Sequence, residues 1–195
     1  TRPVIVVGHG ARDGIDQIVQ LAERLGAPII TTFKAKGLVG DHHPLAGGVL
    51  GRSGTPVASW VMNESDLLIV FGASFSDHTG IASYKPIIQV DRDPAGLGRF
   101  HPVTVPVLAD SASAAVALLA AADGLQTVDQ RRDLAGRWRI WRREKASRAA
   151  DDRDAGVASA AVFAELSDAV APDAVIAVDV GNNTYSFRRY FECRA

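Results

Sequence analysis

The chain has 195 residues, of which 47% are hydrophobic and 22% are charged, and its formal net charge is −1. This is the composition of an ordinary globular protein, and the near-zero charge argues against nucleic acid or an anionic membrane surface as a partner. Cys193 is the single cysteine, which excludes an internal disulfide framework and fits a reducing, cytoplasmic setting. No apolar run reaches the ~20 residues that a membrane-spanning helix requires.

Short apolar runs predict the β-strands of the first half of the chain. They cover residues 4–7, 28–32, 67–71, 86–90 and 103–107. Each run is almost continuously apolar, as is typical of parallel strands that are buried on both faces.

Helical patterns separate these strands. Residues 15–25 place apolar side chains near one face and are followed by Gly26, a residue that commonly ends helices. Further helices are predicted over residues 56–64 and 111–122, the last with Asp110 or Ser111 as its N-cap. The alternation predicts an α/β fold, namely a doubly wound, Rossmann-like parallel sheet of five to six strands with helices on both faces.

The composition changes after residue 124. Residues 125–154 are rich in Arg, Asp and Trp and predict a surface helix followed by a polar linker. Acidic residues are interspersed among the basic ones, and Trp138 and Trp141 share one helical face, so docking onto a domain is favoured over nucleic-acid binding. Residues 157–170 then predict an amphipathic helix.

The sequence DAVIAVDVGNNTYSF follows and predicts a strand over residues 173–179 and a turn at 180–184 that leads into a helix. With so few residues remaining, a complete βα unit is not expected here. We therefore expect three parts: a nucleotide-binding-like domain at 1–124, a helical and polar linker at 125–154, and the start of another domain at 155–195.

The stretch VIVVGHGARDG is similar to a dinucleotide-binding turn but departs from it. Asp13 stands where the strict pattern requires glycine or alanine, and the second strand ends in Thr31 and Thr32 rather than in an acid for an NAD ribose. NAD binding in the usual manner is not expected. Gly8 and Gly10 either let the backbone approach a ligand at the carboxyl edge of the sheet or form a tight turn without one.

Residues 31–60 form a glycine-rich segment that contains His42 and His43. Its backbone N–H groups could face an anion or an extended cofactor. The two histidines have no neighbouring ligands in the sequence, so a structural or exposed pair is favoured over a metal site. Asp91 and Asp93 follow a strand and suit either sugar hydroxyls or the capping of a helix that begins at Pro94.

Taken in order, these segments resemble one family. RPVIVVGHGA, the long stretch from LAERLGAPIITTFKAKG to DLLIVFGASFSDHTG, IIQVDRDPAGLGR and VPVLAD are similar to the central domain of thiamine diphosphate-dependent enzymes of the acetolactate synthase and pyruvate oxidase type. The resemblance covers residues 1–122. It resumes at 157–190, where AVIAVDVGNNTYSFRRYF resembles the start of the family's diphosphate-binding domain.

The resemblance implies a transferase or lyase that joins or cleaves 2-oxo acids with thiamine diphosphate and Mg²⁺. In the family, an activating glutamate lies in a domain that precedes this one, and a GDG…N metal signature lies in the domain that follows. Residues 1–195 contain no GDG. We therefore expect a fragment that is inactive by itself, works with the rest of its parent polypeptide, and comes from a homodimeric or homotetrameric enzyme.

The resemblance also implies a possible FAD site in this domain. Its residues would be Gly8, Gly10, Gly51, Arg52, Gly54 and Thr55 along the flavin and ribityl region, Gly72, Ala73 and Ser74 at the next strand end, and Asp91 and Asp110 near the adenosine. Arg52 and Ser53 replace a Met-His pair of the synthases, and SFSDH replaces a segment with two arginines. The alternative is a non-catalytic nucleotide- or FAD-binding module of the same fold.

Overall fold

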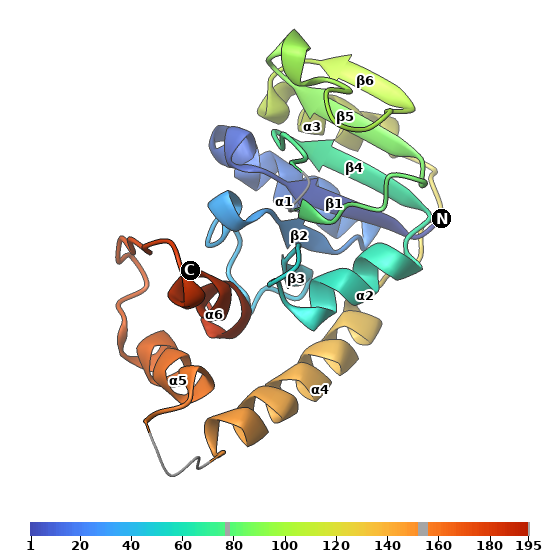
Figure 1. Ribbon diagram of the computed structural model, residues 1–195. Coiled ribbons are helices and arrows are strands. Elements are labelled where there is room, and N and C mark those ends of the chain that lie inside the picture. The colour runs from blue at the N-terminus through green and yellow to red at the C-terminus, as the bar shows by residue number, and fades with distance from the viewer. Residues whose placement is uncertain (77–78, 152–155, 195) are drawn as a thin grey trace.

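The computed structural model describes residues 1–76, 79–151 and 156–194 and contains a six-stranded parallel sheet with the strand order β3-β2-β1-β4-β5-β6 (Figure 1). This is the order of a doubly wound Rossmann sheet, so the predicted fold class is confirmed. The strands are β1 (Pro3–Val7), β2 (Ile29–Thr31), β3 (Ala46–Val49), β4 (Leu67–Phe71), β5 (Ile87–Asp91) and β6 (Val105–Leu108).

The helices also follow the sequence expectations closely. They are α1 (Ile15–Leu25), α2 (Pro56–Glu64), α3 (Ser111–Ala121), α4 (Arg131–Ala149), α5 (Ser159–Ala169) and α6 (Asn182–Tyr190). Gly26 ends α1 with φ +58, and the Asp110 carboxylate caps α3 by accepting from the N–H groups of Ala112 and Ser113. In the described part of the chain, none of the helices combines the length and apolar character needed to cross a bilayer.

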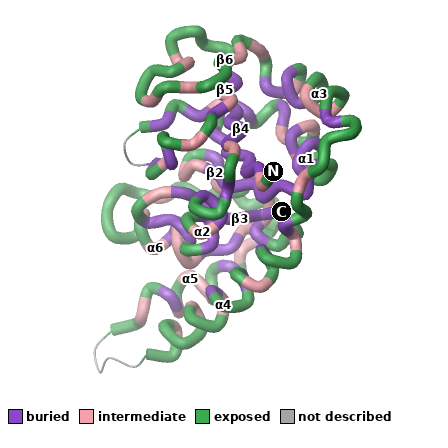
Figure 2. The backbone as a smooth tube through the Cα atoms, turned by 90° about the vertical axis from the view of Figure 1, so that its right-hand side faces the viewer, coloured by how far each residue is buried: buried purple, intermediate pink, exposed green. Residues whose placement is uncertain are grey.

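Both faces of the sheet are buried because successive strand residues point to opposite sides. Val4 and Val6 of β1 belong to the core under α2 and α4, whereas Ile5 and Val7 pack with α1 and α3. Strand β4 alternates in the same way. The most deeply buried backbone therefore runs through the middle of the sheet, as Figure 2 shows. This explains why the strands are continuously apolar in sequence.

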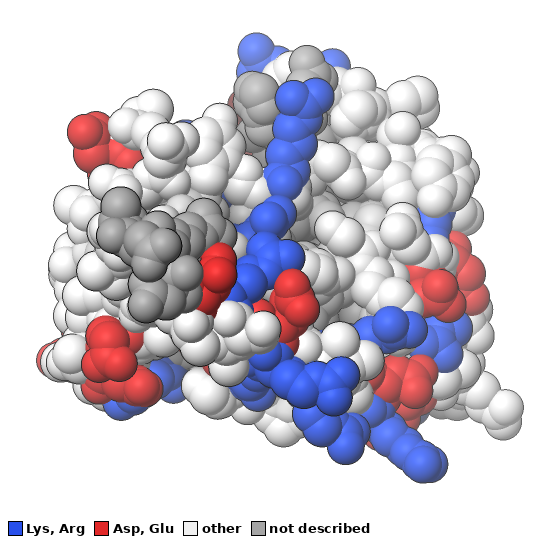
Figure 3. Space-filling model, turned by 60° about the horizontal axis from the view of Figure 1, so that its bottom comes forward, with Lys and Arg blue, Asp and Glu red and all other residues white. Residues whose placement is uncertain are grey.

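Helix α4 docks onto the sheet domain through its tryptophans, as expected. Trp138 and Trp141 are buried, and the Trp138 indole N–H donates to the carbonyl of Ala46 at 2.6 Å. Arg137 lies 4.0 Å from the ring centre of Trp60. On the face that carries α4 and α5, basic and acidic side chains lie near one another rather than forming a field of one sign (Figure 3). The interspersed acids noted in the sequence therefore have a counterpart on the surface.

Two expectations about strands need correction. β3 lies within the glycine-rich segment that the sequence predicted as a loop, since AGGV lacks the β-branched pattern of the other strands. The strand predicted over residues 173–179 is wrong: the structure assigns no strand there, and Val175 is 99% exposed. A strand is stabilised by hydrogen bonds to a neighbouring strand, and residues 174–179 pair with none in the described structure. The following helix, α6, is confirmed.

The loops after β1 and β4 approach each other so closely that glycine is required in both. A Cβ atom built on Gly8 would lie 2.1 Å from the carbonyl oxygen of Gly72, and one on Gly72 would lie 2.4 Å from the Ala11 nitrogen. The Gly10 N–H donates to the same Gly72 carbonyl at 3.0 Å. The obstructing atoms are backbone, which cannot move aside as a flexible side chain can.

Replacing Gly8 with alanine should therefore lower the free energy of unfolding by about 2 kcal/mol or more, because the added methyl group overpacks against backbone. Urea denaturation measures this change. Gly136→Ala is the matched control: Gly136 lies within α4, with Arg139 Nη2 4.0 Å from its added methyl group, so a gain of about 0.5 kcal/mol is expected. Equal stability of Gly8→Ala and the unmodified chain would contradict the close approach.

Candidate functional site: a crevice at the carboxyl edge of the sheet

A crevice at the carboxyl edge of the sheet has a volume of about 680 Å³. It opens beside the loops that follow β1 and β4, where the strand order reverses. Ligands of open α/β sheets bind at this topological switch point. The crevice is lined by residues of the loops after β1, β2, β3 and β4, by the end of β5, and by α6: Gly8, His9, Gly10, Thr32, Phe33, Lys34, Leu50, Arg52, Ser53, Gly72, Ala73, Ser74, Phe75, Ser76, Thr79, Asp91, Tyr185 and Arg188.

Seven of the eleven residues expected to bind the flavin line this crevice, although they come from four separate stretches of sequence. They are Gly8, Gly10, Arg52, Gly72, Ala73, Ser74 and Asp91. Asp77 and His78, the end of the SFSDH segment, lie outside the described residues.

The other four expected residues, Gly51, Gly54, Thr55 and Asp110, do not line the crevice. Gly54 is confined by backbone, because a Cβ atom there would lie 2.0 Å from the Val49 carbonyl oxygen. Thr55 is buried and caps α2, accepting from the Ala58 N–H, while its hydroxyl lies 3.3 Å from the Gly47 carbonyl. Asp110 caps α3. These residues shape the neighbouring loops and helices.

The glycine-turn amides that the sequence offered as anion ligands already have partners. The Gly8 N–H donates to the Phe71 carbonyl at 2.8 Å, and the Gly10 N–H donates to the Gly72 carbonyl. In the next loop, the Gly54 N–H donates to Gly51 at 2.9 Å. Between the two readings left open for Gly8 and Gly10, the geometry favours close backbone packing. The amides of Gly8 and Gly10 are therefore not free to hold an anion in the crevice.

Gln89, which the sequence reasoning missed, links the loop after β4, which lines the crevice, to the loop after β5 from inside the sheet. This β5 side chain is fully buried, donates to the Gly96 carbonyl at 3.0 Å and accepts from the Gly98 N–H at 2.9 Å. Its amide nitrogen also lies 3.5 Å from the Ala73 carbonyl. A polar residue within an apolar strand pattern is the signal that could have revealed it, since buried polar groups need partners.

Three cationic side chains line the crevice: Lys34, Arg52 and Arg188. Only Arg52 was expected from the sequence. Lys34 follows the end of β2, and this position at the carboxyl edge of a strand could have indicated it. Arg188 comes from α6, so only the tertiary structure reveals its position. Its guanidinium lies 3.8 Å from the ring centre of Phe33, and burial lowers its pKa while nearby Tyr185 acts in the opposite direction.

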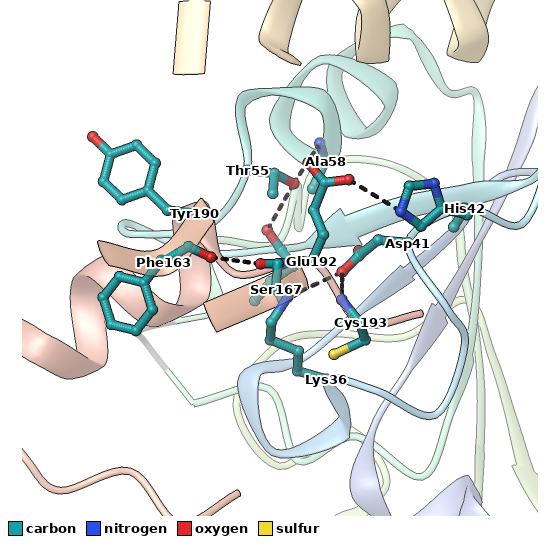
Figure 4. A network of polar contacts seen from close by, with 12 residues as sticks. Lys36, Asp41, His42, Thr55, Ala58, Phe163, Ser167, Tyr190, Glu192 and Cys193 are labelled. Carbon is teal, nitrogen blue, oxygen red and sulfur yellow. Dashed lines mark hydrogen bonds and ion pairs between the residues drawn. The ribbon is translucent and has the colours of Figure 1, made fainter. Parts of the chain in front are cut away.

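α6 is held against the sheet domain by a charged cluster around Glu192 (Figure 4). Arg142 of α4 donates to the buried Glu192 carboxylate through Nε at 3.0 Å, and Lys145 donates to its other oxygen. His42 lies 3.6 Å away. The Glu192 N–H also donates to the hydroxyl of Ser167 in α5 at 3.0 Å. Glu192, two residues beyond the end of α6, thus contacts α4 through its carboxylate and α5 through its backbone N–H.

A second buried ion pair lies beside this cluster. Lys36 Nζ is 3.2 Å from Asp41 Oδ2, and the Cys193 N–H donates to the same oxygen at 2.8 Å. The Asp41 N–H returns a hydrogen bond to the Cys193 carbonyl at 2.8 Å. Burial raises the pKa of the Cys193 thiol, Asp41 adds to this and Lys36 opposes it, so the thiol stays protonated near neutral pH.

The Glu192 carboxylate is stabilised in its charged form. Burial acts to raise its pKa, but the hydrogen bonds and charges of Lys145 and Arg142 outweigh burial and lower the pKa below the ordinary value of 4.5. A carboxyl group whose folded-state pKa is depressed stabilises the fold above its unfolded-state pKa. This contribution is lost as the pH falls through the lower folded-state value.

In the described residues, no group of three or more His, Cys, Asp or Glu side chains is arranged to hold a metal ion. His42 faces Glu192, while His43 Nε2 lies 3.5 Å from Glu23 and His43 Nδ1 accepts from the Leu45 N–H. The two histidines thus have separate structural partners.

Comparison with known families agrees with the fold. Residues 1–119 match the family model described as the central domain of thiamine pyrophosphate enzymes. The chain belongs to this family. The family resemblance inferred from the sequence motifs is therefore confirmed.

Relatives extend the similarity beyond the matched domain. The chain is 35% identical to YdaP, a putative thiamine pyrophosphate-containing protein of Bacillus subtilis. The alignment covers 100% of this chain and 34% of YdaP. A pyruvate oxidase of Lactiplantibacillus plantarum is 28% identical over 98% of the chain and 32% of its own length. A probable acetolactate synthase large subunit of Methanococcus aeolicus is 38% identical over 56% of the chain and 20% of its own length. The chain thus spans about a third or less of these relatives.

Glu192→Gln should loosen the attachment of α6, because it leaves two cations near a group that no longer carries charge. The expected loss is about 3 kcal/mol of local stability. Hydrogen exchange over residues 187–193 measures it. Glu144→Gln is the control, since its pair with Arg148 is exposed and should contribute less than about 0.5 kcal/mol. Unchanged exchange in Glu192→Gln would contradict the role of the cluster.

Proposed function

We propose that this chain is the central-domain part of a thiamine diphosphate-dependent enzyme that acts on 2-oxo acids, by carboligation or decarboxylation. The match over residues 1–119 and the names of the relatives support this proposal. When bound, thiamine diphosphate would supply a thiazolium ring that can stabilise negative charge on the former carbonyl carbon of the substrate. In this proposal, the residues that bind and activate it belong mainly to other parts of the parent polypeptide, and residues 1–195 are not catalytic by themselves.

The central domain contributes a binding crevice for the phosphates and sugar of a nucleotide, with FAD as the candidate ligand. The observation that carries this proposal is the 680 Å³ crevice at the switch point between β1 and β4, whose described lining residues include three cations and one aspartate. Cations suit phosphate groups, and a carboxylate at a strand end suits sugar hydroxyls. The volume lies in the range of about 300–1,000 Å³ of small-molecule sites.

Individual residues have distinct roles in this proposal. Asp91 accepts hydrogen bonds from ribose or ribityl hydroxyls, and Ser74 offers a further hydroxyl on the same edge. Phe33 and Tyr185 offer aromatic surface for a ring. In a glycine-turn phosphate site, backbone amides bind the phosphate. Here the amides of Gly8 and Gly10 already donate to protein carbonyls, so charged side chains bind the phosphate in this proposal.

The remaining proposals concern the parent enzyme. Mg²⁺ accompanies thiamine diphosphate, the assembly is a homodimer or homotetramer, and the protein is cytoplasmic. The chain divides into a central domain at 1–124, a linker at 125–154, and the beginning of a diphosphate-binding domain at 155–195. The comparisons give no support to the alternative of a non-catalytic nucleotide-binding module.

Asp91→Ala should weaken FAD binding about tenfold, because the sugar hydroxyls lose a charged acceptor. The visible spectrum of FAD during titration with the chain measures this affinity. Asp93→Ala is the control, since Asp93 accepts from the Ala95 N–H at 2.9 Å and does not line the crevice. If Asp91→Ala and the unmodified chain bind FAD with equal affinity, Asp91 does not contact the ligand. Its role is then limited to accepting a hydrogen bond from the Asp93 N–H at 3.0 Å.

A further inference from the structure

Arg188 is a cation without a full set of partners in the wall of the crevice. Its Nε atom is buried and has no hydrogen-bond partner among the described residues. The guanidinium stacks on Phe33, which leaves its N–H groups to bind in the plane of the group. A buried donor that lacks an acceptor costs free energy, and no hydrogen bond from the Arg188 guanidinium to a described residue offsets this cost.

Neighbouring basic residues differ from Arg188 in this respect. Arg142 and Lys145 share Glu192, Arg148 bonds Glu144 and Tyr190, and Arg189 donates to the Gly54 carbonyl at 3.4 Å. Arg188 is the residue next to Arg189 on the same helix, yet it lies in the crevice wall. Among the residues that the structure describes, no acid is paired with Arg188.

The chemistry of the crevice indicates which group would satisfy Arg188. Lys34 and Arg52 line the same crevice, so among the described lining residues three permanent positive charges face one carboxylate, that of Asp91. A guanidinium binds phosphate oxygens through two parallel hydrogen bonds, and it remains protonated when it is partly buried. The backbone amides of Gly8 and Gly10 cannot bind the phosphate, because they already donate to protein carbonyls.

We infer that the Arg188 guanidinium binds a phosphate group of the nucleotide in the crevice, so that α6 completes a site whose other walls belong to the central sheet. The inference rests on the proposed nucleotide-binding function and adds a specific residue from the C-terminal segment. It also connects ligand binding with the docking of α6, because the Glu192 cluster that follows α6 holds the helix in place.

The experiment compares FAD with riboflavin, which carries the same ring and ribityl chain but no phosphate. Both are titrated into the 195-residue chain and into Arg188→Gln, Arg188→Lys and Arg189→Gln, with flavin fluorescence as the readout. Circular dichroism establishes that each variant is folded, and Arg188→Lys supplies a milder change should Arg188→Gln unfold. Arg189→Gln is the matched control on the same helix.

The expected result is that Arg188→Gln weakens FAD binding roughly 10- to 100-fold and leaves riboflavin binding unchanged. Arg188→Lys keeps the positive charge but cannot form the two parallel hydrogen bonds of a guanidinium, so its FAD affinity should lie between those of Arg188→Gln and the unmodified chain. The FAD affinity of Arg189→Gln should match that of the unmodified chain. FAD binding that is equal in Arg188→Gln and the unmodified chain would overturn the inference and leave the proposed crevice function standing. An equal loss for FAD and riboflavin would also overturn it. Failure of the unmodified chain to bind FAD would overturn the proposed flavin site itself.

Discussion

The backbone contact between the loops after β1 and β4 fixes the geometry on which the crevice depends. The Gly72 carbonyl accepts from the Gly10 N–H, and side chains are excluded at Gly8 and Gly72. The two loops meet where the strand order reverses, so the crevice begins at this contact. The contact uses the Gly10 amide, and the side chains of Lys34, Arg52 and Arg188 line the crevice that begins there.

The docking of α6 supplies the last of these side chains. Glu192 binds Arg142 and Lys145 of α4, while Cys193 bonds with Asp41 in the loop before β3. Phe187 and Phe191 stack with a centroid separation of 4.7 Å and are buried. Polar and apolar contacts thus cooperate to attach a segment that follows an exposed stretch at 174–180. Residues of the C-terminal helix α6 and of the sheet loops therefore line the same crevice.

The sequence predicted most of the fold because its local signals agree with its tertiary structure. Helix α2 begins and ends where expected, since Thr55 caps it and Pro56 occupies its first turn. β3 was missed because AGGV has weak strand propensity and depends on pairing with β2. The strand expected at 173–179 did not form because apolar character cannot replace a neighbouring strand. Motif glycines and one strand-end acid, Asp91, indicated residues that the structure brings to one crevice, whereas Arg188 and Gln89 become visible through contacts between distant segments.

Hydrogen exchange of the chain with and without FAD tests the central claim most directly, namely that the carboxyl-edge loops and α6 form one nucleotide-binding crevice. Added protection is predicted in three separate segments, residues 8–10, 72–76 and 185–188, because they line the same cavity. Little change is predicted in β6 and α3, whose residues lie outside it. Protection confined to β6 and α3, or protection of the sheet loops without that of residues 185–188, would contradict the account.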